Sequence, residues 1–397
     1  MIPKRFIAVS LLLLFLHSCG IRSLLVVSSA DLKDYQPKEI TIPYEEVYGL
    51  IVVPIVIDGK TYRFIFDTGA GTTVISAELA KLPSFKRKGS ISINDAKQVS
   101  NKLPIGHLSS LSLGELNYTK VGVVVNDFST NAQFNCFGID GILGMNVIQQ
   151  NNWKIDYEKA RLISYDLNFV PTFTENTHEF PFASKTGTPY VHWYVNGTKD
   201  RLMIDTGKNG DIISVSSDVE INAKKKQSIG YASFGMFGET AMDTTNYYQV
   251  NLSDSLDFNL TNVSITQDKD SKSIIGNGFL KRNYASVFFD FKNRKMQCVS
   301  PTHHSTIYNS YGISVMFETG GLVIGSKDLE FSEEVDQITI NDRILEVNGV
   351  VVTNENICEL TKTMGENKQN KKSVTLLLLH EGEKKKVVLE LREVVAN

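Results

Sequence analysis

The chain contains 397 residues, of which 42% are hydrophobic and 21% are charged, and its formal net charge is −3. This length predicts two or three globular domains, and the near-neutral charge argues against a large basic surface for nucleic acid. The sequence has neither a glycine-rich phosphate-binding loop nor a histidine or cysteine spacing typical of a metal site, so we expect no cofactor and no bound metal.

The N-terminal residues 1–19 have the features of a signal peptide. Two basic residues precede an apolar run over residues 6–16, which is too short to span a bilayer. The sequence Leu16-His17-Ser18-Cys19-Gly20 follows and resembles a bacterial lipobox, which implies that Cys19 is lipidated and becomes the mature N-terminus. We therefore expect a lipid-anchored protein of the bacterial cell envelope, periplasmic or associated with the outer membrane, with residues 20–44 as a polar tether.

The alternative is a simple secretory signal that is cleaved after Ala30, in which case the protein is secreted. Both routes place the mature chain outside the cytoplasm.

The triplet Asp-Thr-Gly occurs twice, at residues 67–69 and 205–207. Each copy ends an apolar run that is expected to be a strand. The aspartate follows, by eight residues, the glycine of an Asp-Gly or Asn-Gly hairpin signal, Gly59 in the first copy and Gly197 in the second. A lone triplet of this kind is compatible with an ordinary turn.

Further matching segments follow in the same order in both halves of the chain. Residues 140–144 and 273–276 each end in two apolar residues and a glycine, and two strand-like runs come after them, residues 153–157 and 287–291. This ordered agreement predicts an internal duplication, with β lobes over residues 45–170 and 171–300. The alternative is that the two triplets are only turns, and the agreement of three matched elements between the two halves would then be a coincidence.

Two aspartates brought face to face have a specific chemistry. Two carboxyl groups at hydrogen-bond distance repel each other strongly when both are ionised, so they share one proton. One of them can then act as a base and the other as an acid on a water molecule held between them.

The constellation resembles the aspartic proteases of the pepsin and retropepsin type over residues 45–300. The resemblance implies a mainly β, two-lobed fold with the active site in the cleft between the lobes. It assigns catalysis to Asp67 and Asp205, and support of the two catalytic loops to the other residues of the triplets, Thr68, Gly69, Thr206 and Gly207. One chain would supply both aspartates, so we expect a monomer that cleaves peptide or protein substrates.

Two features differ from the family pattern or are not defined by it. Lys208 stands where the family has a small residue. Its charge could lower the pKa of the pair, or its side chain could extend into solvent without effect. For the flaps that cover substrate we expect residues 105–108 in the first lobe and residues 231–237 in the second. Ala70, which follows the first triplet, is the residue found in retropepsins at this position, and we therefore expect a mildly acidic pH optimum.

A change in composition at residues 301–310 predicts a linker to an α/β unit over residues 311–397. The stretch Asn341 to Gly349 resembles the Gly-Asp-x-Ile-Leu-x-Ile-Asn-Gly motif of PDZ domains, which capture peptides by strand addition. The resemblance implies a peptide carboxylate loop at Tyr311, Gly312 and Ile313. The alternative is a PDZ fold that only packs against the protease lobes.

Beyond Cys19, three cysteines remain, Cys136, Cys298 and Cys358. An odd number leaves at least one free thiol or an intermolecular bond, and we expect buried single cysteines that behave as small hydrophobic residues.

The sequence thus predicts an aspartic endopeptidase whose PDZ domain captures a C-terminal peptide or regulates access. The alternatives are a non-catalytic peptide-binding lipoprotein of the envelope that retains the protease fold, and an envelope scaffold acting mainly through the PDZ domain.

Overall fold

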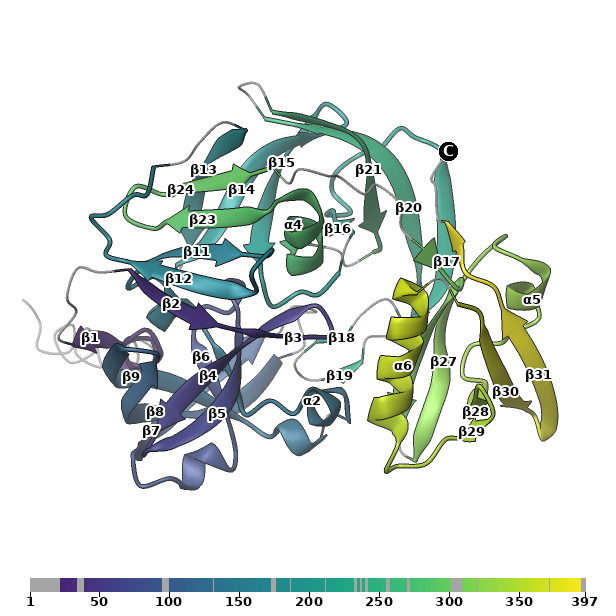
Figure 1. The fold of residues 1–397 in the computed structure, drawn as a ribbon, viewed down its shortest axis with the longest axis horizontal. Helices are drawn as coiled ribbons and strands as arrows, with labels where there is room; N and C mark the ends of the chain where they lie inside the picture. The colour runs from purple at the N-terminus through teal and green to yellow at the C-terminus, as the bar shows by residue number, and fades with distance from the viewer. Residues whose placement is uncertain are drawn as a thin grey trace, which may run out of the picture.

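A computed structural model gives the fold, which is mainly β (Figure 1). It describes residues 22–33, 39–94, 100–130, 132–172, 176–185, 187–210, 212–231, 234–235, 238–239, 242–254, 258–269, 272–300, 309–318, 320–370 and 372–393. The proposed lipidation site Cys19, its lipobox and most of the expected linker lie outside these residues. In the described part, no helix is long and apolar enough to cross a membrane.

The first lobe is built on a nine-stranded sheet with the order β1-β9-β6-β10-β5-β4-β8-β7, to which β3 adds by pairing with β4. Its strands are β1 (Asp31–Lys33), β3 (Glu45–Val47), β4 (Leu50–Ile57), β5 (Lys60–Phe66), β6 (Thr73–Ser76), β7 (Phe85–Asn94), β8 (Ser100–Leu113), β9 (Leu116–Asn126) and β10 (Gly141–Leu143). The hairpin signal before the first triplet joins β4 to β5, and both of its turn residues, Asp58 and Gly59, have positive φ.

The second lobe repeats this arrangement around β14 (Thr188–Val195), β15 (Thr198–Asp205), β16 (Ile213–Ser214), β17 (Lys225–Tyr231), β20 (Met242–Ser253), β21 (Asn259–Gln267) and β22 (Ile274–Gly276). Asn196 and Gly197 form the turn between β14 and β15, again with positive φ at both residues. In each lobe the strand that ends at the Asp-Thr-Gly triplet pairs in parallel with the short strand predicted to support it: β5 with β10 and β15 with β22.

A shared sheet connects the two lobes. Its order is β2-β12-β11-β23-β24-β13, so equivalent strands of the two lobes stand at mirrored places in the sheet. The strands are β2 (Ile40–Pro43), β11 (Asn152–Asp156), β12 (Arg161–Tyr165), β13 (Thr177–Lys185), β23 (Ser286–Asp290) and β24 (Lys295–Val299). Trp153 lies opposite Phe289 at the join, and both side chains are fully buried in a core that extends through both lobes.

The prediction that residues 20–44 form a polar tether is wrong for most of the described part of that segment. Residues 22–27 are helical, β1 pairs with β9, and β2 pairs with β12. The Gly122 N–H donates to the Ser29 carbonyl (2.8 Å), and the Asn146 side-chain amide donates to the same oxygen (3.1 Å). An ideal Cβ at Gly122 would lie 1.9 Å from the Val26 oxygen, so only glycine allows this close approach. The segment therefore belongs to the folded first lobe.

The C-terminal unit has its own core and contains, in chain order, a strand pair, a short helix, a second strand pair, a long helix and a hairpin. Its elements are β25 (Asn309–Ser310), β26 (Ile313–Glu318), β27 (Gly321–Asp328), α5 (Glu333–Asp336), β28 (Arg343–Val347), β29 (Val350–Val351), α6 (Ile357–Gln369), β30 (Val374–His380), β31 (Glu383–Leu389) and β32 (Arg392–Glu393). Asn341 has a φ of 70°, the left-handed conformation expected where asparagine replaces glycine.

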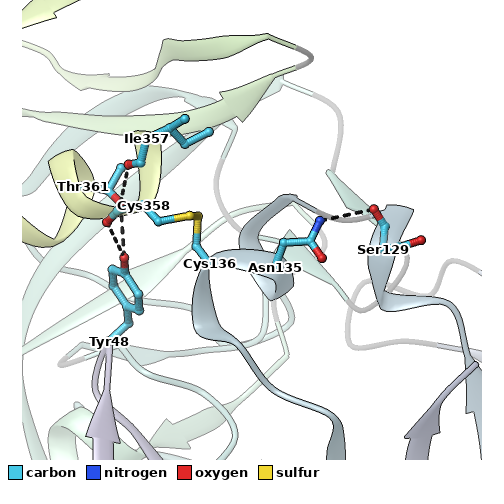
Figure 2. Close-up of a disulfide and its surroundings, with 7 residues drawn as sticks. All are labelled: Tyr48, Ser129, Asn135, Cys136, Ile357, Cys358 and Thr361. Atoms are coloured by element: carbon cyan, nitrogen blue, oxygen red, sulfur yellow. Dashed lines mark hydrogen bonds between the residues drawn. A yellow bond between two sulfur atoms is a disulfide. The ribbon is translucent and has the colours of Figure 1, made fainter. Parts of the chain in front are cut away.

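Two connections hold this unit against the lobes. Strand β27 continues past β28 and pairs with β17 of the second lobe, with Ile229 opposite Lys327. On the other side, Cys136 of α2 (Ala132–Phe137) in the first lobe forms a disulfide with Cys358 of α6 (Figure 2). The expectation of three single cysteines is therefore wrong for two of them, because residues 222 positions apart in sequence meet at this junction. Cys298 is free and buried.

Candidate active site

Asp67 and Asp205 stand at equivalent places, where β5 and β15 end. The Asp67 N–H donates to the Leu143 carbonyl of β10 (3.1 Å), and Asp205 lies opposite Gly276 of β22 in the parallel ladder. The loops that follow are closed in the same way, since the Met145 N–H donates to the Ala70 carbonyl and the Asn277 N–H donates to the Lys208 carbonyl, each at 2.7 Å. The short strands with the apolar-apolar-glycine pattern thus support the two aspartates.

Each carboxylate is oriented by the backbone of its own loop. Asp67 Oδ1 accepts the N–H groups of Gly69 (2.7 Å) and Ala70 (2.9 Å). Asp205 Oδ1 accepts the N–H of Gly207 (2.9 Å). These bonds hold one oxygen of each carboxyl group against the backbone of its own loop.

The two threonines connect the loops to each other. Thr68 Oγ1 donates to the Ile204 carbonyl (2.8 Å) and accepts the Thr206 N–H (3.1 Å). Thr206 Oγ1 donates to the Phe66 carbonyl (2.7 Å) and accepts the Thr68 N–H (3.0 Å). Both threonines are completely buried. The four reciprocal bonds hold the carboxyl groups at a defined separation, as a reaction sensitive to small displacements requires.

The glycines of the triplets make room for the opposite aspartate. A Cβ added to Gly69 would lie 2.4 Å from Asp205 Cγ, and one added to Gly207 would lie 2.3 Å from Asp67 Cγ. Each carboxyl group therefore occupies the space that a side chain on the opposite loop would need.

The buried environment raises the pKa of both carboxyl groups. Burial, followed by the charge of Asp205, raises the pKa of Asp67 well above its usual value. Burial also raises the pKa of Asp205, but the hydrogen bond from Asp67 and the charge of Lys208 oppose this rise. The pair titrates as a unit, and the charge of Lys208 acts on its Asp205 side.

Lys208 is partly buried and turned toward its own lobe, where its Nζ donates to Ser214 Oγ at the end of β16. Of the two roles considered from the sequence, this position fits an electrostatic effect on Asp205 rather than a side chain extended into solvent.

The structure does not support the expected flap of the first lobe. Residues 105–108 lie inside β8, between β7 and β9, and the side chains of Ile105 and Leu108 are fully buried. A cover for substrate has to reach solvent, so this assignment is wrong. The glycine that suggested it, Gly106, is instead required by close packing, because its Cβ would lie 2.4 Å from the Lys86 oxygen.

In the second lobe, the expected flap, residues 231–237, lies only partly among the described residues. Tyr231 ends β17, and the following short strands β18 (Phe234–Gly235) and β19 (Gly238–Glu239) pair with each other.

The expected peptide carboxylate loop lies in the C-terminal unit, between β25 and β26. Tyr311 is buried and its hydroxyl donates to the Lys372 carbonyl (2.6 Å). The Gly312 N–H donates to Ser310 Oγ (3.0 Å), and Ile313 begins β26. These three residues are separate from the aspartate pair.

Sequence reasoning missed the asparagines behind the catalytic loops. Asn146 Oδ1 accepts both the N–H and the hydroxyl of Thr73 (2.8 Å each). Asn277 accepts the Tyr157 hydroxyl (2.9 Å) and donates to the Gly49 carbonyl (2.8 Å). Both asparagines follow closely after an apolar-apolar-glycine segment, and this repeated position is the feature of the sequence that could have identified them.

Comparison with known proteins gives a family match in sequence and many similar solved structures. Residues 53–147 match the model of a family described as aspartyl protease. No curated protein matches the chain in sequence. The fold is similar to basic 7S globulin from soybean, with 9% identity and a TM-score of 0.42 over 67% of this chain and 96% of that one. It is also similar to an aspartic proteinase from Irpex lacteus, with 14% identity and a TM-score of 0.44 over 68% of this chain and 99% of that one.

Proposed function

We propose that this chain is an aspartic endopeptidase that hydrolyses peptide bonds with a water molecule activated by Asp67 and Asp205. The observation that carries the proposal is the placement of each carboxyl group against the glycine of the opposite loop, while Thr68 and Thr206 connect the two loops. The family match over residues 53–147 supports it independently.

The proposed reaction starts with the shared proton on Asp67, because the charge of Lys208 favours the ionised form of Asp205. The ionised Asp205 takes a proton from the water, whose oxygen attacks the scissile carbonyl carbon. Asp67 donates its proton to the carbonyl oxygen, which gives a neutral tetrahedral diol. As the C–N bond breaks, the proton now on Asp205 passes to the leaving nitrogen and Asp67 recovers a proton from the diol, so the pair returns to its starting state.

For the C-terminal unit we propose a PDZ domain. The sequence from Asn341 to Gly349, the left-handed Asn341 and the helix α6 after β29 support this assignment. Its peptide groove would lie between β26 and α6, with Tyr311, Gly312 and Ile313 at the carboxylate end.

We also propose that the mature protein lies in the bacterial cell envelope, anchored through Cys19. The disulfide between Cys136 and Cys358 supports an oxidising compartment. The packing of residues 22–30 on the first lobe favours processing at Cys19 over cleavage after Ala30, because the latter would remove Val27 and Ser29 from their contacts.

The test uses a soluble chain that begins at residue 22 and therefore keeps this segment. It is incubated with denatured protein substrates from pH 3 to pH 8, beside the Asp67→Asn and Asp205→Asn variants. We expect fragments from the unmodified chain and none from either variant. Cleavage that persists in both variants would contradict the dyad, and peptide binding without cleavage in all three proteins would favour a non-catalytic peptide-binding protein.

A further inference from the structure

The turn between β3 and β4 contacts the C-terminal unit on one side and the Asp205 loop on the other. Its two residues, Tyr48 and Gly49, both have positive φ, 50° and 79°. A tyrosine in this region of conformational space is uncommon and costs about 1 kcal/mol, so its surroundings must hold it there.

On the first side, the Tyr48 side chain reaches α6 (Figure 2). Its hydroxyl donates to the Cys358 carbonyl (3.0 Å) and lies 3.2 Å from Thr361 Oγ1. Its ring centroid is 4.9 Å from that of Phe137, the residue after Cys136. The tyrosine therefore packs beside the disulfide and contacts both helices that the disulfide joins.

On the second side, the backbone of the turn accepts hydrogen bonds from the second lobe. The Tyr48 carbonyl accepts from Asn209 Nδ2 (3.0 Å), and the Gly49 carbonyl accepts from Asn277 Nδ2 (2.8 Å). Asn277 is almost fully buried, and its own N–H donates to the Lys208 carbonyl (2.7 Å). The turn thus holds the residues that directly follow the second catalytic triplet.

The support of the two catalytic loops is not symmetric. In the first lobe, Asn146 binds Thr73, Ser29 and Gly122, which all belong to that lobe. In the second lobe, Asn277 reaches across to Gly49 of the other lobe. The loop of Asp205 is therefore held by a turn that the C-terminal unit also contacts.

The disulfide acts locally on this arrangement. It joins α2 to the start of α6, whereas the pairing of β17 with β27 holds the other side of the C-terminal unit. Breaking the disulfide would leave that pairing in place and free α6 to move away from Tyr48. The first consequence would be loss of the Tyr48–Cys358 contact rather than detachment of the whole unit.

We propose that Tyr48 is a positioning residue for Asp205 and that the Cys136–Cys358 disulfide controls peptide hydrolysis through it, an inference that rests on the proposed protease function. The oxidised protein is the active form. A dithiol reductant, itself oxidised to a disulfide, would convert the bond to two cysteine thiols and lower kcat. Because Tyr48 and the disulfide act on the loop that carries Asp205, the change should fall on kcat, and the substrate KM should change little.

The experiment compares kcat and KM of the full chain before and after reduction with dithiothreitol, beside Tyr48→Phe and the double variant Cys136→Ser/Cys358→Ser. Tyr118→Phe is the matched control, since it also removes a buried hydroxyl, here one that donates to Asn151 inside the first lobe (3.0 Å). We expect kcat to fall about tenfold on reduction and in the double variant, within the ~100-fold that a 1 Å misplacement can cost. Tyr48→Phe should fall by less, and the double variant should no longer respond to dithiothreitol.

Amide hydrogen exchange provides a readout that needs no activity. Exchange at residues 207–210 should become faster on reduction, while exchange at residues 69–71, in the loop of the other aspartate, should not change. Unchanged kcat and unchanged exchange, or a higher kcat after reduction, would overturn the coupling while leaving the protease function intact. If the oxidised protein cleaves nothing, the protease function fails, and the exchange comparison still decides whether the disulfide positions the loop.

Discussion

The carboxyl group of Asp205 fills the space in which a side chain on Gly69 would have to begin, because an ideal Cβ at Gly69 would lie 2.4 Å from Asp205 Cγ. The same relationship holds between Gly207 and Asp67, at 2.3 Å. The triplets therefore do more than form two turns, because the absence of a side chain on each glycine leaves room for the aspartate of the other lobe.

Gly69→Ala should separate the two carboxyl groups. The added methyl has no room unless Asp205 moves, and a displacement of about 1 Å can cost 100-fold in rate. We expect kcat to fall by about that factor or more in a peptide cleavage assay, with the far-UV circular dichroism spectrum retained. Gly365→Ala is the control, since nothing lies within 4 Å of its Cβ position in α6. Equal activity in both variants would contradict the close contact.

Thr206→Val should weaken the connection between the loops without changing side-chain volume appreciably. It removes the donor to the Phe66 carbonyl and leaves the Thr68 N–H without its acceptor in a buried site. An unsatisfied buried group costs about 1–3 kcal/mol, so the urea midpoint should fall accordingly, together with kcat. Thr198→Val, at an exposed site in the β14–β15 hairpin, should change neither quantity.

Lys208→Met should shift the acid side of the pH–rate profile to higher pH. The charge of Lys208 lowers the pKa of Asp205, and burial raises it. Without the charge, Asp205 stays protonated to a higher pH, and activity requires its ionised form. The profile of kcat/KM against pH measures this shift. Lys199→Met, which removes an exposed lysine from the same lobe, should leave the profile in place. A shift to lower pH would contradict the assignment of charge to Asp205.

Asp67→Asn should stabilise the protein at neutral pH. The pKa of Asp67 is raised by folding, so the stability linked to its protonation is complete below the unfolded-state value and is lost as pH rises through the folded-state value. An asparagine keeps an oxygen for the Gly69 and Ala70 N–H groups and carries no charge to bury. Urea midpoints should therefore favour the variant at pH 7 and converge with the unmodified chain near pH 3. A variant less stable at pH 7 would contradict the raised pKa.

The sequence alone was sufficient to locate the duplicated lobes and the aspartate pair. The triplets, their hairpin glycines and the apolar-apolar-glycine steps are local patterns, and a duplicated chain repeats them in a fixed order. The same is true of the turn positions, since Gly59, Gly197 and Asn341 all adopt the positive φ that their residue types favour. These features depend on backbone sterics and strand periodicity, which neighbouring residues determine.

Tertiary structure decided the features that depend on distances between remote residues. The bond between Cys136 and Cys358 spans 222 positions, and Tyr48 reaches both the Asp205 loop and α6 without a local pattern that marks it. The sequence predicts that residues 22–33 belong to a tether, yet they contact the first lobe, and the glycine at position 106 serves packing rather than a flap. The effect of the Lys208 charge on Asp205 likewise depends on where the fold places the two side chains.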